Sequence, residues 1–313
     1  AVLMIITFGF AYNSVQSNTI CLAWQKAFGI EPATMGIALT VLTLIIIFGG
    51  IQRVAKFSST VVPVMAVVYL LIAVGVVVWN ITSLPKVLLT IVENAFGFNQ
   101  AAGGVLGVTV IQGIKRGLFS NEAGEGSAPN AAAVATVSHP VKQGLIQALG
   151  VFTDTLVVCS CTAFIILVSG VDVTASNGIQ LTQDALTHEI GSIGNPFVAV
   201  MIWLFAFSSI IGNYYYGETN VRYIKDSKLG VFLYRLAVAA MVMVGAVVSL
   251  DFAWSFADIT MALLTLCNLV AIVLLSRQAV FLLQDYRQQK KEGKNPVFCK
   301  DKMPEIADKL EAW

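Results

Sequence analysis

Charged residues are scarce in this chain of 313 residues, where they make up only 12% of the sequence. A typical soluble domain has about 25%. The two histidines and five cysteines show no metal-binding spacing, and no disulfide framework is implied. The net charge of +1 gives no indication of a nucleic-acid partner. What remains is an apolar fraction of 57% with a mean hydropathy of +0.79, which indicates an all-α polytopic membrane protein.

The start of the sequence does not fit the pattern of a signal peptide, and we expect none there. Ala1 opens directly on the apolar run Val2 to Phe10, with no initiator methionine, no basic segment and no small-residue cleavage site. We therefore expect the chain to start inside a membrane helix of a longer protein.

Long apolar runs predict about eight membrane helices, because roughly 20 apolar residues are needed to cross a bilayer. The expected spans cover residues 1–22, 35–50, 60–80, 104–137, 141–168, 196–221, 230–250 and 254–276. Residues 85–97 form a short amphipathic stretch expected at the membrane interface, and residues 169–194 are expected to form a polar loop. Residues 1–278 would then form the transmembrane domain and residues 279–313 a cytoplasmic tail.

Basic residues fall on one set of alternate connections between these spans. This set carries Arg53 and Lys56, then His139 and Lys142, then the cluster 222–235, then the Lys-rich tail. The other set is mostly acidic. Because cytoplasmic loops carry an excess of Lys and Arg, we expect a multi-pass protein of the plasma membrane, in bacteria the inner membrane, with a cytoplasmic C-terminus.

One expected span, 104–137, is interrupted by the polar run 113–130. In hydrocarbon, irregular backbone persists only where it lines a buried cavity. Gly117, Gly124 and Gly126 relax the backbone there, and Ser127 or Asn121 could cap a new helix with Pro129 in its first turn. We expect residues 117–128 to be unwound between two half-helices, whose free N–H and C=O groups suit a carboxylate and a small cation. The alternative is a loop between two short helices.

Charged residues lie at or near this break and need partners, because an unpaired charge in the membrane is costly. Lys115, Arg116, Glu122 and Glu125 lie in the run itself, and Asp154 lies in the middle of the next span. Internal pairing is the favoured role over substrate contact. We expect Arg116 to pair with Asp154 or Glu122.

Two other spans carry polar stripes at helical spacing. One consists of Asn13, Gln16 and Ser17; the other runs from Ser208 and Ser209 through Asn213 to Tyr216. Such groups can simply join helices, but two stripes beside a broken helix favour a polar cavity. An intramembrane serine hydrolase at residues 124–128 lacks a histidine base in any span, so we do not expect an enzyme.

The run from Arg116 to Pro129, RGLFSNEAGEGSAP, resembles the signature of the alanine or glycine:cation symporter family, the sodium:alanine symporters of bacteria and archaea. The segments 7–10, 16–18, 48–51, 139–144, 154–155 and 215–218 are similar as well. The resemblance covers residues 1 to about 285.

The resemblance implies part of a five-plus-five inverted-repeat bundle of the leucine-transporter type, and sodium-coupled symport of alanine or glycine by alternating access. Sodium would be the coupling ion, with no other cofactor. Ser208 and Ser209 would bind it. The substrate would contact the following residues: Phe119, Ser120, Asn121 and Gly124 at the break, and Gln16 on the first helix, with Gly126 and Asn13 completing the candidate set.

The other broken helix of the family is expected upstream of residue 1, so these 313 residues alone are not expected to transport. Two alternatives stay open: a proton-coupled carrier of small amino acids, and a membrane receptor that binds an amino acid without moving it. Substrate preference, ion stoichiometry and oligomeric state are not determined by the sequence.

Overall fold

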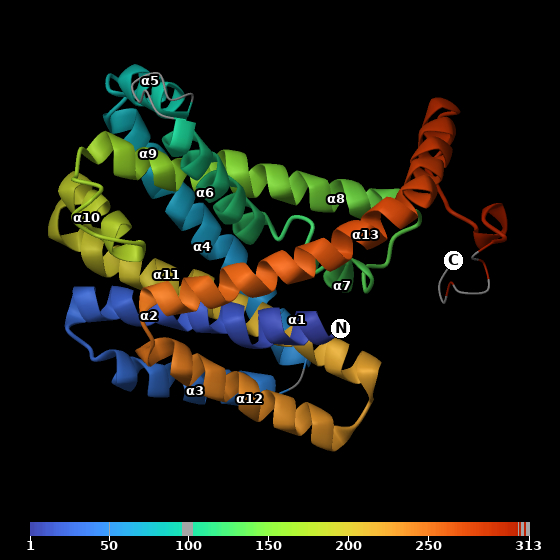
Figure 1. Ribbon diagram of the computed structural model, residues 1–313. Coiled ribbons are helices and arrows are strands. Elements are labelled where there is room, and N and C mark those ends of the chain that lie inside the picture. The colour runs from blue at the N-terminus through green and yellow to red at the C-terminus, as the bar shows by residue number, and fades with distance from the viewer. Residues whose placement is uncertain (50, 96–102, 306, 308–309, 311–313) are drawn as a thin grey trace.

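The computed structural model describes every residue except 50, 96–102, 306, 308–309 and 311–313, and all regular structure in the described part is helical (Figure 1). The first helix runs without interruption through α1 (Val2–Ile6), the π-helical segment η1 (Thr7–Tyr12) and α2 (Asn13–Phe28). It ends at Gly29, whose left-handed φ of 68° gives a common helix stop. The helix expected at 1–22 therefore continues to Phe28.

Three helices follow the first one. They are α3 (Pro32–Ile47), α4 (Ile51–Trp79) and α5 (Leu84–Ala95). The chain turns by 101° between the Pro63–Trp79 part of α4 and α5. The short helix α5 covers most of the amphipathic stretch expected at 85–97, whose last residues lie outside the described part.

The central part of the chain holds α6 (Gly103–Asn121) and the five-residue α7 (Ala128–Ala132). A continuous helix then runs through α8 (Pro140–Thr153), the π-helical segment η2 (Asp154–Cys159) and α9 (Ser160–Ser169). Its bounds match the span expected at 141–168. The ring of His139 caps its start by accepting a hydrogen bond from the Val141 N–H at 3.2 Å.

The remaining elements are α10 (Ile179–Ile190), η3 (Gly191–Ile193), α11 (Gly194–Ile224), α12 (Lys228–Val247), α13 (Leu250–Lys291) and the short η4 (Lys300–Lys302). The expectation of a polar loop at 169–194 is wrong, because α10 occupies half of it. Ala185 and Leu186 on α10 are buried against α4, α9 and α11. Burial of this apolar stripe holds the segment in a helix although its other residues are polar.

Fewer than eight helices in the described residues meet the length and hydropathy expected of a membrane span. In the described residues four helices are long and apolar enough to cross a membrane: Pro140–Ser169, Ile179–Ile224, Lys228–Val247 and Leu250–Lys291, with the bent α4–α5 pair as a fifth. The first helix is excluded by its polar stripe, and α3 by its length of 16 residues. The expected count of about eight spans and the inverted repeat therefore stay predictions.

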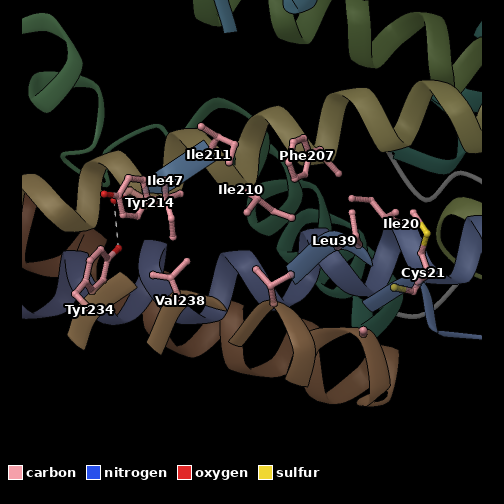
Figure 2. Packing of buried hydrophobic residues seen from close by; sticks show 14 residues of the cluster. Ile20, Cys21, Leu39, Ile47, Phe207, Ile210, Ile211, Tyr214, Tyr234 and Val238 are labelled. Atoms are coloured by element: carbon pink, nitrogen blue, oxygen red, sulfur yellow. Dashed lines mark hydrogen bonds between the residues drawn. The ribbon is translucent and has the colours of Figure 1, made fainter. Parts of the chain in front are cut away.

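The main apolar core lies where α2, α3, α11 and α12 pack together. Figure 2 shows Ile20, Leu39, Phe207, Ile210 and Val238 meeting between these helices, all less than 2% exposed. Burying one such side chain contributes about 1.5–3 kcal/mol in water. In a bilayer the equivalent gain comes from close packing rather than from expulsion of water.

Glycines allow the backbones in this core to approach closely. A Cβ on Gly245 of α12 would lie 2.5 Å from the Cα of Ser14, and one on Gly217 of α11 would lie 1.8 Å from the hydroxyl oxygen of Tyr234. Close approach then permits hydrogen bonds between helices, such as that from Ser17 Oγ to the Val242 carbonyl at 2.6 Å. Small residues at helix crossings are the usual means of packing in membranes.

A second core positions the break. Met4, Phe8, Ala11, Tyr12 and Val15 of the first helix pack against the α13 residues Ala253, Ala257, Met261 and Leu264. The first helix is thereby enclosed between α13 on one side and α11 and α12 on the other (Figure 1). By contrast, the most apolar window of Pro140–Ser169 is only 6% buried within the described residues.

Candidate functional site

The break between α6 and α7 is confined to six residues, 122–127. Glu122 has a φ of 50°, the one positive value among the described non-glycine residues, and Gly124 and Gly126 have φ values of 81° and 82°. The expectation that residues 117–128 are unwound is correct only for this inner part, because α6 continues through Gly117 to Asn121. Left-handed backbone at a non-glycine residue costs about 1–3 kcal/mol, so packing around the break must hold it.

The second half-helix is also shorter than expected. α7 has five residues, and residues 133–139 are not helical, so the predicted span 104–137 ends early. The break and α7 are anchored by amide side chains. Asn268 of α13 donates to the Gly124 carbonyl at 2.9 Å, and Asn130 donates to the Gly126 carbonyl at 3.0 Å. Asn220 of α11 in turn donates to Asn130 at 3.1 Å.

Two carboxylates of the break each accept one hydrogen bond. Ser127 donates to Glu122 at 2.5 Å, across the break itself. Tyr12 of the π-helical segment η1 donates to Glu125 at 2.7 Å. Glu125 and Ser127 have no exposed surface. These two hydrogen bonds therefore join the break to itself and to the first helix.

Arg116 does not pair as expected. Its guanidinium contacts Asp258 of α13 at 2.5 Å rather than Asp154 or Glu122, and it lies over the ring of Trp254 at 4.0 Å from the centroid. Lys115 reaches the same carboxylate at 3.3 Å. Packing of α13 against α6 decides this pairing, since the pattern of charges along the chain is equally compatible with the nearer carboxylates.

Asp154 has a different role from the expected ion pair. It accepts a hydrogen bond from Ser120 at 2.5 Å, and Ser120 also lies 3.2 Å from the sulfur of Cys159. Beside it, Thr155 donates to Asn121 at 2.9 Å. The π-helical segment η2 thus faces the last turn of α6. Ser120 is exposed, so this end of α6 is open in the described part of the chain.

A hydrogen bond between two amide side chains joins the first helix to α11. Asn13 has no exposed surface, donates to the Gly9 carbonyl at 3.0 Å and accepts from Asn213 at 3.2 Å. Phe119 packs between Tyr12 and Trp254, with centroid distances of 4.6 and 4.8 Å. Phe119 therefore lies against Tyr12, which bonds to the break, while Asn13 and Asn213 form a contact between the first helix and α11.

Other predicted residues lie apart from these contacts. Gln16 is half-buried one turn further along the first helix. Ser208 and Ser209 both donate to the Phe205 carbonyl of their own helix, at 2.8 and 3.1 Å. Their oxygen lone pairs stay available to a cation. Within the described residues no group of three or more His, Cys, Asp or Glu side chains is placed to hold a metal ion.

Four residues that define this site escaped the sequence analysis: Tyr12, Trp254, Asp258 and Asn268. Asp258 lies within the expected span 254–276, and a carboxylate in a membrane helix is itself a signal of function or pairing. Tyr12 directly precedes Asn13 of the polar stripe. Neither signal identifies the partner, because the contacts join segments more than 100 residues apart.

These features define a class: a multi-pass helical membrane protein with a broken helix held by buried polar contacts, the construction that secondary transporters use for solute sites. The model of the sodium:alanine symporter family matches residues 1–300, so the chain belongs to that family. The resemblance noted from the motif at 116–129 is thereby confirmed.

Relatives with curated names agree with this membership. The chain is 54% identical to the probable sodium/glutamine symporter GlnT of Bacillus subtilis over 96% of its length and 63% of that protein. It is 50% identical to the amino-acid carrier protein AlsT of the same organism, over 100% of this chain and 67% of the relative. It is 35% identical to the sodium/alanine symporter AgcS of Methanococcus maripaludis, over 90% and 63%. The chain spans about two thirds of the length of these relatives.

Proposed function

We propose that the protein of which this chain is a part carries out sodium-coupled symport of a small neutral amino acid, alanine or glycine, across the plasma membrane by alternating access. The observation that supports this most directly is the break at 122–127, held by Asn268 of α13 and by Tyr12 of the first helix. Unwound backbone exposes N–H and C=O groups that a zwitterion can use.

In this proposal the substrate contacts the end of α6 and the break through Phe119, Ser120, Asn121, Gly124 and Gly126, and the first helix through Asn13 and Gln16. Sodium is held near Ser208 and Ser209, which lie on the same helix as Asn213. Because Asn213 bonds to Asn13, a cation on α11 can bias the position of the first helix. Sodium and substrate then favour the same conformation, which is the condition for coupling. The C-terminus is cytoplasmic.

Counterflow of labelled alanine in proteoliposomes that contain the complete gene product tests this function. Uptake should depend on sodium and should be reduced by Ser209→Ala more than by Ser276→Ala, a matched change on exposed α13. Binding without counterflow would indicate a receptor. Uptake that is unchanged without sodium would reject sodium coupling.

A second substrate needs the same test. The relative that is 54% identical is named a probable sodium/glutamine symporter, so glutamine belongs in the competition assay beside alanine and glycine. If glutamine competes at least about tenfold better than alanine, a difference of about 1.4 kcal/mol, the substrate assignment changes from alanine to glutamine.

A further inference from the structure

The segment that follows α13 turns back onto the connection between α7 and α8. The Phe298 N–H donates to the Ser138 carbonyl at 2.9 Å, and the Ser138 hydroxyl donates to the Pro296 carbonyl at 2.9 Å. Lys142, in the first turn of α8, donates to the side-chain oxygen of Asn295 at 2.7 Å. Two segments more than 150 residues apart in the sequence are thereby joined through both backbone and side chains.

A buried histidine lies at the centre of this contact. His139 has no exposed surface, and the ring centroids of Tyr286 and Phe298 lie 5.3 and 5.8 Å from that of its imidazole. Its Nδ1 accepts a hydrogen bond from the Val141 N–H, so the ring proton is on Nε2, which lies 3.3 Å from Asp285 Oδ2. Both ring nitrogens therefore have partners, one in α8 and one in α13.

The same aspartate fixes the C-terminal segment to α13. Asp285 Oδ1 contacts Lys302 at 2.6 Å, and Gln289, one turn further along α13, donates to Asp285 Oδ2 at 2.8 Å. Gln289 also makes two hydrogen bonds to the backbone of Val297, each 2.9 Å long. Residues 295–302, which we call the latch, therefore bind both the end of α13 and the start of α8.

The latch joins two elements that the proposed function requires to move relative to each other. α13 packs on the first helix in the second core. α8 instead follows the broken helix, because only residues 133–139 separate it from α7. In alternating access the broken helix changes its position against the first helix, and α7 cannot shift without moving the connection that the latch holds.

The connection carries His139 and Lys142 and belongs to the basic set expected on the cytoplasmic side, as does the C-terminal segment. We propose that the latch is an autoinhibitory contact of the carrier. While bound, it holds the α7–α8 connection against α13, and the cytoplasmic side of the solute site opens only when the latch is released. This inference rests on the proposed function.

The effect on transport follows from the contacts. Bonds that exist in one conformation only shift the equilibrium toward that conformation. Loss of one net hydrogen bond changes such an equilibrium by about two- to tenfold. Conformational opening limits turnover in many proteins of this kind of cycle, so a weakened latch should increase the rate of exchange.

Counterflow of labelled alanine in proteoliposomes that contain the complete gene product tests the latch. Asn295→Ala and Phe298→Ala should each increase the initial rate at least about threefold. Asn295 is exposed, so its variant keeps the test valid even if Phe298→Ala fails to fold. Lys294→Ala is the matched control and should leave the rate unchanged, because Lys294 is exposed and pairs with Glu292 instead of the α7–α8 connection.

Locking the latch should have the opposite effect. Lys142→Cys and Asn295→Cys place two thiols where the parent side chains meet at 2.7 Å, in a protein that also carries the changes Cys267→Ser and Cys299→Ser at its exposed cysteines. A short bis-maleimide should join the two thiols and reduce the counterflow rate at least about tenfold. The same protein without the reagent should be as fast as Asn295→Ala.

The possible outcomes separate the two proposals. An unchanged or lower rate in Asn295→Ala, or a full rate in the cross-linked protein, would overturn the autoinhibitory role. Failure of the two thiols to cross-link would refute the latch itself, whether or not the protein transports. A wild type without counterflow of alanine or glutamine would instead refute the proposed function.

Discussion

Gly126 offers the sharpest test of how the break is held. Its φ of 82° lies in the left-handed region, and a Cβ there would come within 2.8 Å of Asn268 Oδ1. Gly126→Ala therefore combines two costs. Left-handed backbone at a residue with a Cβ costs roughly 1–2 kcal/mol. Displacing Asn268 also removes its hydrogen bond to the Gly124 carbonyl, worth about 1 kcal/mol.

The sum is a destabilisation of about 2–3 kcal/mol, which should lower the apparent Tm of the purified protein by on the order of 5 °C. Thermal unfolding in detergent, followed by circular dichroism, measures this. Gly144→Ala is the matched control, since Gly144 lies within helix α8 with nothing within 4 Å of an added Cβ. There alanine should be neutral or stabilising by up to about 1 kcal/mol.

The double variant Gly126→Ala/Asn268→Ala separates the two costs. Removing the Asn268 side chain relieves the clash but not the backbone strain. The double variant should therefore be less destabilised than the sum of the single variants, with a coupling of about 0.5–1 kcal/mol. If Gly126→Ala unfolds at the wild-type temperature, or if the two changes add without coupling, the described geometry of the break is wrong.

Three further changes test other contacts. Asp258→Asn leaves Arg116 without its counter-charge and should destabilise the protein by about 1 kcal/mol in thermal unfolding, because the Arg116 side chain is 38% exposed and the pair is only partly buried; an unchanged Tm would refute the pairing. Ser209→Ala should raise the sodium concentration for half-maximal uptake by about tenfold, and an unaltered sodium dependence in a flux assay would remove this residue from the ion site. Gly217→Val places a side chain on Tyr234 and should cost at least about 1–3 kcal/mol by overpacking, measured as a lower yield of monodisperse protein and a lower Tm; normal yield and Tm would contradict the close approach.

Much of the site could be predicted from the sequence because its signals are local. Glycines at 124 and 126 and the polar run around them indicate an interruption in an apolar segment wherever the rest of the chain lies. The length of the unwound part could not be predicted in the same way. Gly117 has little intrinsic preference for a helix. It is helical because ion pairs from Lys115 and Arg116 to Asp258 hold α6 against α13.

The misplaced ion pair has the same origin. Asp154 and Glu122 are closer to Arg116 along the chain than Asp258 is, but distance along the chain says little about which helix packs against α6. The segment of α10 was predicted to be a loop because most of its residues are polar. It is a helix because Ala185 and Leu186 pack against α4, α9 and α11.

The sequence by itself determined the membrane class, the family and the position of the break, since scarcity of charge, a long specific motif and glycine placement act through local physics. Only the tertiary structure decided which polar groups meet: Tyr12 with Glu125, Asn268 with Gly124, and Asp258 with Arg116. The physical reason is that in a membrane every buried polar group needs a partner, but which partner it finds depends on how distant helices pack.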